Sequence, residues 1–313
     1  MSKFKILVSD SLDEEGLALL KQGGEVSYQP KISAEDLVVE IGPYHALVVR
    51  SRTKVTAAVI QAGAQLKVIG RAGVGVDNID LAAAAAAGVA VVNSPLAATT
   101  AVAEMTIGLA LALARQLPAL DAAMKMGKWE KGGTLGSELS GKTLGIVGLG
   151  RIGSQVARYA SALGMHVLAY HPEYSAAEVS QLGAQVAAFD ELLVQSDYIS
   201  LHLPLTEETH NFLGPAQFER MKPGVRLVNT ARGGIIDEAA LCQALDSGRV
   251  AGAALDVFAV EPVTAGSIAS HPRVIATPHI ASQTVEAQAR AGVAIAEEVL
   301  AALEGRPLRW RVV

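Results

Sequence analysis

Short runs of Val, Ile and Leu alternate along the chain with longer segments that have helical periodicity. Such apolar runs are typical of parallel strands that are buried between two layers of helices. In the first third of the chain the pattern predicts five strands, at residues 5–9, 25–28, 46–50, 67–70 and 89–92. The alternation therefore predicts an α/β fold.

A second series of elements follows a long apolar helix that we expect at residues 99–116. Pro118 and a polar, glycine-rich segment come next, and we interpret this segment as the approach to a second unit. Seven more strand-like runs begin at Thr143: TLGIVGLGRIG, MHVLAYH, AQVAAF, DYISLHLPL, VRLVNTARGG, VAGAALDVF and RVIATPH. A final helix at about residues 284–304 is long enough to return toward the first unit, which is consistent with a discontinuous smaller domain.

Composition and charge narrow the class of protein. With 313 residues and a formal net charge of −5, the chain is not expected to bind nucleic acid. No apolar run approaches the ~20 residues that span a bilayer, and the N-terminus lacks the pattern of a secretory signal, so we expect no membrane segment. Cys242 is the only cysteine, which prevents an intramolecular disulfide. We therefore expect a cytoplasmic protein.

A phosphate-binding turn is predicted where the second series begins. Gly148, Gly150 and Gly153 form G-L-G-R-I-G, directly after an apolar strand and directly before a helical run. In this context the glycines allow a tight turn, close approach of the backbone to a pyrophosphate, and close packing of helix on strand. The helix N-terminus would add free N–H groups and a partial positive charge. A dinucleotide is the expected ligand.

The choice between NAD and NADP depends on the end of the next strand. An NAD site usually has a carboxylate there, about 20 residues after the motif, to bind the ribose hydroxyls. This chain has His171 at that place, and Glu173 follows two residues later. A histidine does not repel a 2′-phosphate. We expect NAD, and NADP remains open.

Three polar residues lie where predicted strands meet loops, which is the usual ligand edge of an open α/β sheet. His279 follows the last strand and is a candidate general acid or base. Glu261, in DVFAVEP, is a candidate partner that would orient the imidazole. Arg232 follows VRLVNT, where a guanidinium can bind a carboxylate in bidentate fashion. The sequence contains no metal-ligand spacing such as H-E-x-x-H, so we expect no metal.

These segments together resemble one family, the D-isomer-specific 2-hydroxyacid dehydrogenases, and within it the phosphoglycerate dehydrogenases. The resemblance extends over nearly the whole chain and is carried by VVRSRTKV, GRAGVGVDNID, NSPLAATTAVAEMTIGL, GKTLGIVGLGRIG, HLPLTEETHNFLG, LVNTARGGIIDEAAL, AGAALDVFAVEP and TPHIAS. The catalytic Arg, Glu and His of the family correspond to Arg232, Glu261 and His279.

The resemblance implies a flavodoxin-like substrate-binding domain at residues 1–98 and 284–313, and a Rossmann dinucleotide-binding domain at residues 99–283. Substrate would lie in the cleft between them, and the enzyme would be a homodimer or homotetramer. The implied reaction is oxidation of a D-2-hydroxy acid by NAD, 3-phosphoglycerate foremost, as in serine biosynthesis. Besides the glycine motif and His171, the implied cofactor residues are Arg151, Ile152, His202, Pro204, Thr209, Thr230 and Asp256. The implied substrate residues are Arg50, Val74, Gly75, Arg232 and His279.

Two departures from the phosphoglycerate dehydrogenase pattern leave the substrate open. Ala98 stands where these enzymes commonly have Asn, and Arg52 stands where they usually have a small residue. An extra cation at Arg52 would suit a phosphate, a sulfonate or a second carboxylate. The alternatives are a glyoxylate or hydroxypyruvate reductase, a sulfolactate dehydrogenase and, in another class, a dinucleotide-sensing co-repressor. Since the sequence ends at Val313, we expect no C-terminal regulatory domain.

Overall fold

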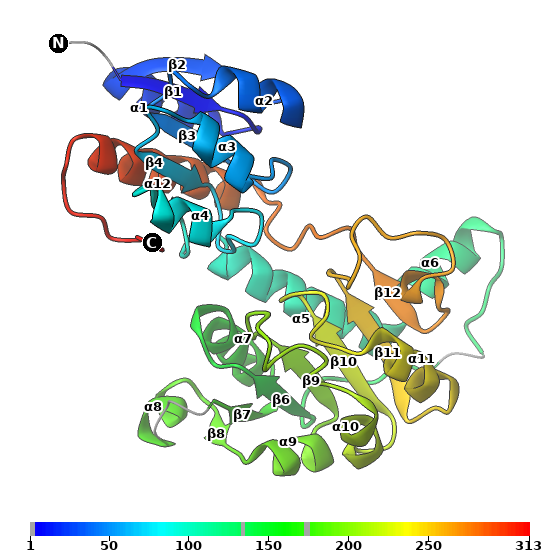
Figure 1. Ribbon diagram of the computed structural model, residues 1–313. Coiled ribbons are helices and arrows are strands. Elements are labelled where there is room, and N and C mark those ends of the chain that lie inside the picture. The colour runs from blue at the N-terminus through cyan, green and yellow to red at the C-terminus, as the bar shows by residue number, and fades with distance from the viewer. Residues whose placement is uncertain (1–3, 133–134, 172–175) are drawn as a thin grey trace. The chain divides into compact units, whose positions relative to one another are not determined.

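The computed structural model describes residues 4–132, 135–171 and 176–313. Contacts between Cα atoms divide the chain into two compact units (Figure 1). Unit 1 comprises Met1–Thr99 and Ser282–Val313, and unit 2 comprises Thr100–Ala281. Unit 1 is therefore built from both ends of the chain.

Unit 1 contains a parallel sheet with the strand order β2-β1-β3-β4-β5, which is the flavodoxin-like doubly wound order. The strands are β1 (Phe4–Val8), β2 (Gly24–Tyr28), β3 (Ala46–Val49), β4 (Val68–Arg71) and β5 (Ala90–Asn93). The helices are α1 (Glu14–Gly23), α2 (Ala34–Glu40), α3 (Ala57–Ala62), α4 (Leu81–Ala86) and α12 (Val285–Leu303). The β3 strand is buried at every position, as a strand covered on both faces must be.

The last helix belongs to the core of unit 1. Ile295 and Val299 of α12 are fully buried and pack with Ile6 and Val68 of the sheet. After α12 the chain runs along β5, where the Val312 N–H donates to the Val91 carbonyl. The buried Glu298 carboxylate fixes this tail by accepting the backbone N–H groups of Arg309 and Trp310 and the Nε–H of Arg309.

Unit 2 contains a second parallel sheet with the strand order β12-β11-β10-β9-β6-β7-β8, an extended Rossmann order. The strands are β6 (Thr143–Val147), β7 (His166–Tyr170), β8 (Gln185–Val186), β9 (Tyr198–Leu201), β10 (Val225–Asn229), β11 (Val250–Leu255) and β12 (Val274–Ala276). The helices are α5 (Thr99–Arg115), α6 (Leu117–Lys125), α7 (Arg151–Ala162), α8 (Ala176–Gln181), α9 (Phe189–Gln195), α10 (Pro215–Arg220), α11 (Glu238–Asp246) and the 3-10 turn η1 (Ile268–Ser270).

The predicted α/β class with two doubly wound sheets is confirmed. Each of the five strands expected in the first third lies within one residue of the observed one. The helix α6 was not predicted, because Pro118 was interpreted as the end of helical structure. Gln116 does end α5, with a left-handed φ of 55°, but Pro118 then occupies the first turn of a new helix, where its missing N–H costs nothing.

Within the described residues, no single helix has the length and apolar character needed to cross a membrane. The pair α5 and α6 passes the length and composition test only when taken together, with a bend of 63° between them. Eight residues of α5 are buried, and Ala103 and Leu109 are among those that pack in a core cluster of unit 2.

Candidate functional site

The order of the strands in unit 2 reverses beside β6, and the predicted phosphate turn lies at this point. Gly148 follows β6 with a φ of +96°, and α7 begins after the N-cap residue Gly150. A Cβ added at Gly153 would lie 2.1 Å from the Gly148 carbonyl oxygen, so only glycine lets the helix pack against the turn. A Cβ at Gly150 would meet nothing within 4 Å. The turn therefore presents open backbone and a helix N-terminus, which fit a dinucleotide pyrophosphate.

The predicted cofactor residues near this turn lie at its edges. Arg151 and Ile152 form the first turn of α7, and His171 follows β7 directly. The Gly148 N–H donates to the Tyr170 carbonyl, which ties the glycine turn to the strand end that precedes His171. Glu173, the alternative carboxylate for the ribose, lies outside the described residues.

The strand next to β6 contributes His202, directly after β9. Its Nε2 lies 2.8 Å from the Ser200 hydroxyl, and burial lowers the pKa of His202 to about 3. His202 is thus a neutral group at physiological pH. Farther along, the Thr209 hydroxyl donates to the Pro204 carbonyl at 2.7 Å and accepts the Thr206 N–H, so Thr209 holds the turn that follows Pro204.

Arg232 lies in a loop that is fixed to the next loop along the sheet edge. The buried Asn229 side chain, at the end of β10, accepts the Ala231 N–H and donates to the Arg232 carbonyl. A Cβ at Gly233 would lie 1.8 Å from the Phe258 carbonyl oxygen. Gly233 therefore allows the loop that carries Arg232 to press against the loop that carries Glu261, whose Oε1 accepts the Phe258 N–H at 3.0 Å.

His279 and Glu261 form a direct pair. The His279 Nδ1 lies 2.8 Å from the Glu261 Oε2, and about half of the imidazole is exposed. A carboxylate accepts only, so the Nδ1 carries the hydrogen and the Nε2 of the neutral ring is left as a base. His279 has a left-handed φ of 54°, which is uncommon for a residue other than glycine.

Asp256 fixes the loop that carries His279. Its carboxylate is fully buried after β11 and accepts the Thr277 hydroxyl at 2.6 Å, the Ile280 N–H at 2.9 Å and the Ala281 N–H at 2.8 Å. These bonds bracket His279 on both sides in the sequence. The side chain of Asp256 thus anchors the loop on both sides of His279. A direct contact between Asp256 and the cofactor remains a prediction.

Thr230 is a predicted cofactor residue whose partner the sequence did not indicate. Its hydroxyl lies 2.9 Å from the hydroxyl of Thr106 on α5, and both residues are buried. Thr106 looked like one of many small residues in an apolar helix, and only the folded packing of α5 against β10 brings the two hydroxyls together.

In unit 1, the predicted substrate residues Val74 and Gly75 lie in a loop after β4 that is held through its carbonyl groups. The Ser94 N–H donates to the Gly73 carbonyl, and the Asn93 side chain donates to the Val74 carbonyl at 2.6 Å. Arg50 follows β3, and its guanidinium lies 3.4 Å from the Gln283 side-chain oxygen. Burial lowers the pKa of Arg50, and the nearby Asp10 offsets this effect only in part. The guanidinium still stays charged at neutral pH.

Arg52 was expected to supply an extra cation, and most of its donors are already used inside unit 1. Its Nε pairs with Asp10 at 3.0 Å, and its terminal nitrogens donate to the Ile32 and Ser9 carbonyls and to the Thr53 hydroxyl. A guanidinium has five N–H donors, so these contacts account for four. Arg52 primarily holds the loop after β3 against the end of β1.

Comparison with known proteins identifies the family. Residues 107–281 match the D-isomer specific 2-hydroxyacid dehydrogenase, NAD binding domain. The D-3-phosphoglycerate dehydrogenase of Archaeoglobus fulgidus is 48% identical over 97% of this chain and 58% of its own length. The chain thus spans little more than half of such curated relatives.

Solved structures match this chain over nearly their full lengths. The TT0316 protein from Thermus thermophilus is 36% identical, with a TM-score of 0.90 over 99% of this chain and 100% of its own. A glyoxylate reductase from Paecilomyes thermophila is 33% identical, with a TM-score of 0.90 over 100% and 99%. The glycine turn, the sheet order and these matches agree, and the chain belongs to the D-isomer specific 2-hydroxyacid dehydrogenase family, with an NAD-binding domain in unit 2.

Proposed function

We propose that the protein is an NAD-dependent D-2-hydroxyacid dehydrogenase that oxidises 3-phosphoglycerate to 3-phosphohydroxypyruvate. The observation that carries this proposal is the 2.8 Å pair between His279 and Glu261, at the sheet edge that also carries the glycine turn. The likeness to D-3-phosphoglycerate dehydrogenases over 97% of the chain supports the choice of substrate.

The proposed chemistry divides between three side chains. NAD bound at the glycine turn would supply the acceptor for the hydride from C2 of the substrate. Arg232 binds the substrate carboxylate and orients the C2 hydroxyl. The His279 Nε2 takes the hydroxyl proton, and the Glu261 carboxylate stabilises the imidazolium that results. In reduction of a 2-keto acid the same proton returns from the His279 Nε2 to the C2 oxygen.

Unit 1 is proposed to bind the parts of the substrate that Arg232 and His279 do not contact. Arg50 offers a guanidinium, and the loop at Val74 and Gly75, anchored through its carbonyls, offers backbone N–H groups to an anion. We assign residues 1–98 and 284–313 to this substrate-binding role and residues 99–283 to dinucleotide binding.

A glyoxylate or hydroxypyruvate reductase is the second candidate. Ala98 is buried and offers no side-chain hydrogen bond where phosphoglycerate dehydrogenases commonly have Asn. Most Arg52 donors are also used within the protein, which leaves few N–H groups to bind a phosphate. A smaller keto acid would not need either group.

A homodimer formed through unit 2 is part of the proposal. Large apolar side chains are exposed along α5, α6 and the following segment, and Trp129 keeps 76% of its surface. The others are Leu111, Leu117, Met124 and Met126. Several exposed large apolar side chains within one stretch of the chain favour an interface between copies. Light scattering of the wild type and of Trp129→Ser tests it, and a monomeric wild type would refute it.

The test of function is a substrate panel followed at the absorbance of the reduced nicotinamide. The substrates are 3-phosphoglycerate with NAD and with NADP, and glyoxylate and hydroxypyruvate with the reduced cofactors. We expect turnover of 3-phosphoglycerate with NAD, and loss of turnover with retained NADH binding in His279→Ala. Turnover of glyoxylate alone would favour the second candidate. Tight dinucleotide binding without any turnover would favour a sensing role.

A further inference from the structure

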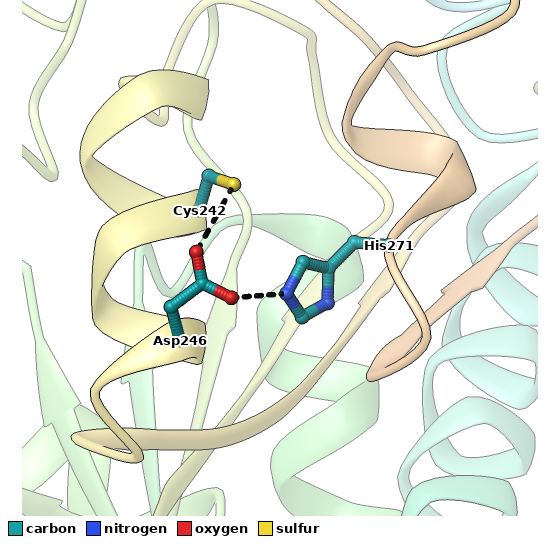
Figure 2. Close-up of side chains that lie close together, drawn as sticks. All are labelled: Cys242, Asp246 and His271. Atoms are coloured by element: carbon teal, nitrogen blue, oxygen red, sulfur yellow. Dashed lines mark hydrogen bonds and ion pairs between the residues drawn. The ribbon is translucent and has the colours of Figure 1, made fainter.

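A cluster of three potential metal ligands lies away from the residues assigned to catalysis. Cys242 and Asp246 are one turn apart on α11, and His271 follows η1 (Figure 2). One ligand atom from each residue lies within 4.8 Å of the other two. The sulfur and the imidazole both face the Asp246 carboxylate, at 3.9 Å for Sγ to Oδ2 and 3.3 Å for Nε2 to Oδ1.

We propose that Cys242, Asp246 and His271 bind a zinc-class divalent cation. In a tetrahedral zinc site, neighbouring ligand atoms are about 3.3 to 3.6 Å apart, with the longer distances involving sulfur. The distance from the His271 Nε2 to the Asp246 Oδ1 already meets this value, the distance from the Cys242 Sγ to the Asp246 Oδ2 is 3.9 Å, and all three ligand atoms lie within 4.8 Å of one another, so a bound ion would draw the sulfur inward. Three protein ligands would leave the fourth position for water or for another ligand.

The charges of the cluster favour a cation. In the metal-free protein the Cys242 thiol donates to Asp246, and on binding a cation the thiol would give up this proton, so that a thiolate and a carboxylate together balance the charge of the ion. Asp246 is also the last residue of α11, where the helix dipole adds partial negative charge. Arg273 opposes this effect in part, because its guanidinium donates to the Leu245 carbonyl at the same helix end. Thiolate and imidazole ligands together select zinc, cobalt or cadmium over magnesium and calcium.

The imidazole of His271 is accessible to a metal only through Nε2. Its Nδ1 accepts the Arg273 N–H at 3.1 Å, so in the metal-free ring the hydrogen is on Nε2, facing Asp246. Metal binding at Nε2 moves the hydrogen to Nδ1 and breaks the bond from Arg273. The tautomer of His271 therefore reports occupancy of the site.

A hollow of about 430 Å³ adjoins the cluster and is lined by Glu238, Cys242, Ser267 and His271 among others. The buried Ser267 hydroxyl oxygen has no hydrogen-bond partner in the described structure. On the side of Cys242, this hollow has space for a fourth ligand of the metal ion. Asp246 is 72% exposed and His271 11% exposed, so the cation would reach the cluster from the solvent side of α11.

The test uses untagged protein and Co²⁺, because Cys242 is the only cysteine and any thiolate-to-cobalt band must come from it. We expect the band to saturate at one Co²⁺ per chain, Zn²⁺ to displace the cobalt, and Zn²⁺ to slow the reaction of Cys242 with a thiol reagent. Cys242→Ser should abolish the band. Asp246→Asn and His271→Gln should each weaken Zn²⁺ binding at least tenfold in calorimetry.

His166→Gln is the matched control, since His166 is exposed at the start of β7 and outside the cluster. Zn²⁺ should also raise the melting temperature of the wild type but not that of Cys242→Ser. Absence of the cobalt band in folded wild type would overturn the proposal. Zinc binding that survives Cys242→Ser unchanged would overturn it equally. Neither result depends on the dehydrogenase activity.

Discussion

The hydroxyl oxygens of Thr106 and Thr230 lie 2.9 Å apart in the core of unit 2. Thr106 also lies 2.8 Å from the Val102 carbonyl, which can only accept, so the single Thr106 hydrogen points there. The Thr230 hydroxyl must then donate to Thr106. Its remaining lone pairs can only accept, so Thr230 is set to receive an N–H donor, such as a carboxamide.

Thr106→Val should therefore weaken dinucleotide binding although Thr106 has no assigned contact with the cofactor. The Thr230 hydroxyl would lose its acceptor and rotate, at a cost of about 0.5 to 1.5 kcal/mol, equivalent to roughly 2- to 13-fold in Kd. NADH fluorescence titration measures this change. Thr106→Ser keeps the hydroxyl and should bind NADH like the wild type. Equal Kd values for the Val variant and the wild type would contradict the proton assignment.

Glu261→Gln should lower kcat by about 10²-fold or more while leaving NADH binding nearly unchanged. The amide of Gln can still contact the His279 Nδ1, but it lacks the charge that stabilises the imidazolium. If its NH₂ turns toward the ring, the Nδ1 becomes an acceptor and the hydrogen of the neutral ring moves to the Nε2, which is then no longer a base. Steady-state kinetics with the best substrate of the panel checks this prediction. Glu286→Gln, on the first turn of α12, is a control that should keep full activity.

Asp256→Asn should damage both stability and turnover. Three donors point at the Asp256 carboxylate, and an amide would set its own NH₂ against at least one of them. Leaving a buried N–H unsatisfied costs about 1 to 3 kcal/mol. We expect a lower melting temperature and a fall in kcat, because the loop at His279 loses its anchor. Retention of wild-type kcat in a destabilised variant would show that the loop does not depend on Asp256.

Asp197→Asn should destabilise unit 2 in a pH-dependent manner. Burial opposes ionisation of Asp197, but hydrogen bonds from Lys222 and from the Thr143 N–H together hold the pKa of the carboxyl below its ordinary value. Because the folded pKa is the lower one, the stabilisation is complete above the unfolded value of about 3.9 and is lost as the pH falls through the folded value.

Urea unfolding checks this prediction. The wild type should exceed Asp197→Asn by about 1 to 3 kcal/mol at pH 7, and the difference should shrink below about pH 4. Asp190→Asn is the control, because Asp190 forms an exposed pair with Arg220 that should contribute less than about 1 kcal/mol. A difference that does not vary between pH 7 and pH 3 would contradict the role of the Asp197 charge.

The features that could be predicted from the sequence are those that depend on a local pattern of residues. The strand positions follow from apolar runs, and the glycine turn follows from the spacing of Gly148, Gly150 and Gly153. The positions of Arg232, Glu261 and His279 at strand ends follow from the rule that parallel strands share a ligand edge. The sequence also indicated Glu261 as a candidate partner of His279, and the structure adds the geometry, with the Nδ1 of His279 lying 2.8 Å from the Oε2 of Glu261.

Contacts that depend on packing between distant elements were not predictable. The partner of Thr230 comes from a helix 124 residues earlier, and Arg52 is held by Asp10 and by the carbonyl groups of Ser9 and Ile32, which precede it by 20 residues or more. Cys242 and Asp246 have an ordinary helical spacing, and nothing in the sequence places His271 beside them. Side-chain identity marks such residues only as candidates, since the geometry that joins them comes from the whole fold.

The two-ended construction of unit 1 sets an order for its formation during synthesis. The chain is made from the N-terminus, so β1 to β5 leave the ribosome long before α12, whose Ile295 and Val299 complete their core. Unit 2 is continuous, and all of its residues emerge before that helix does. Unit 2 can therefore fold first, while the early strands of unit 1 wait with an apolar face uncovered. Until α12 is made, this uncovered apolar face is a site at which the growing chain can aggregate.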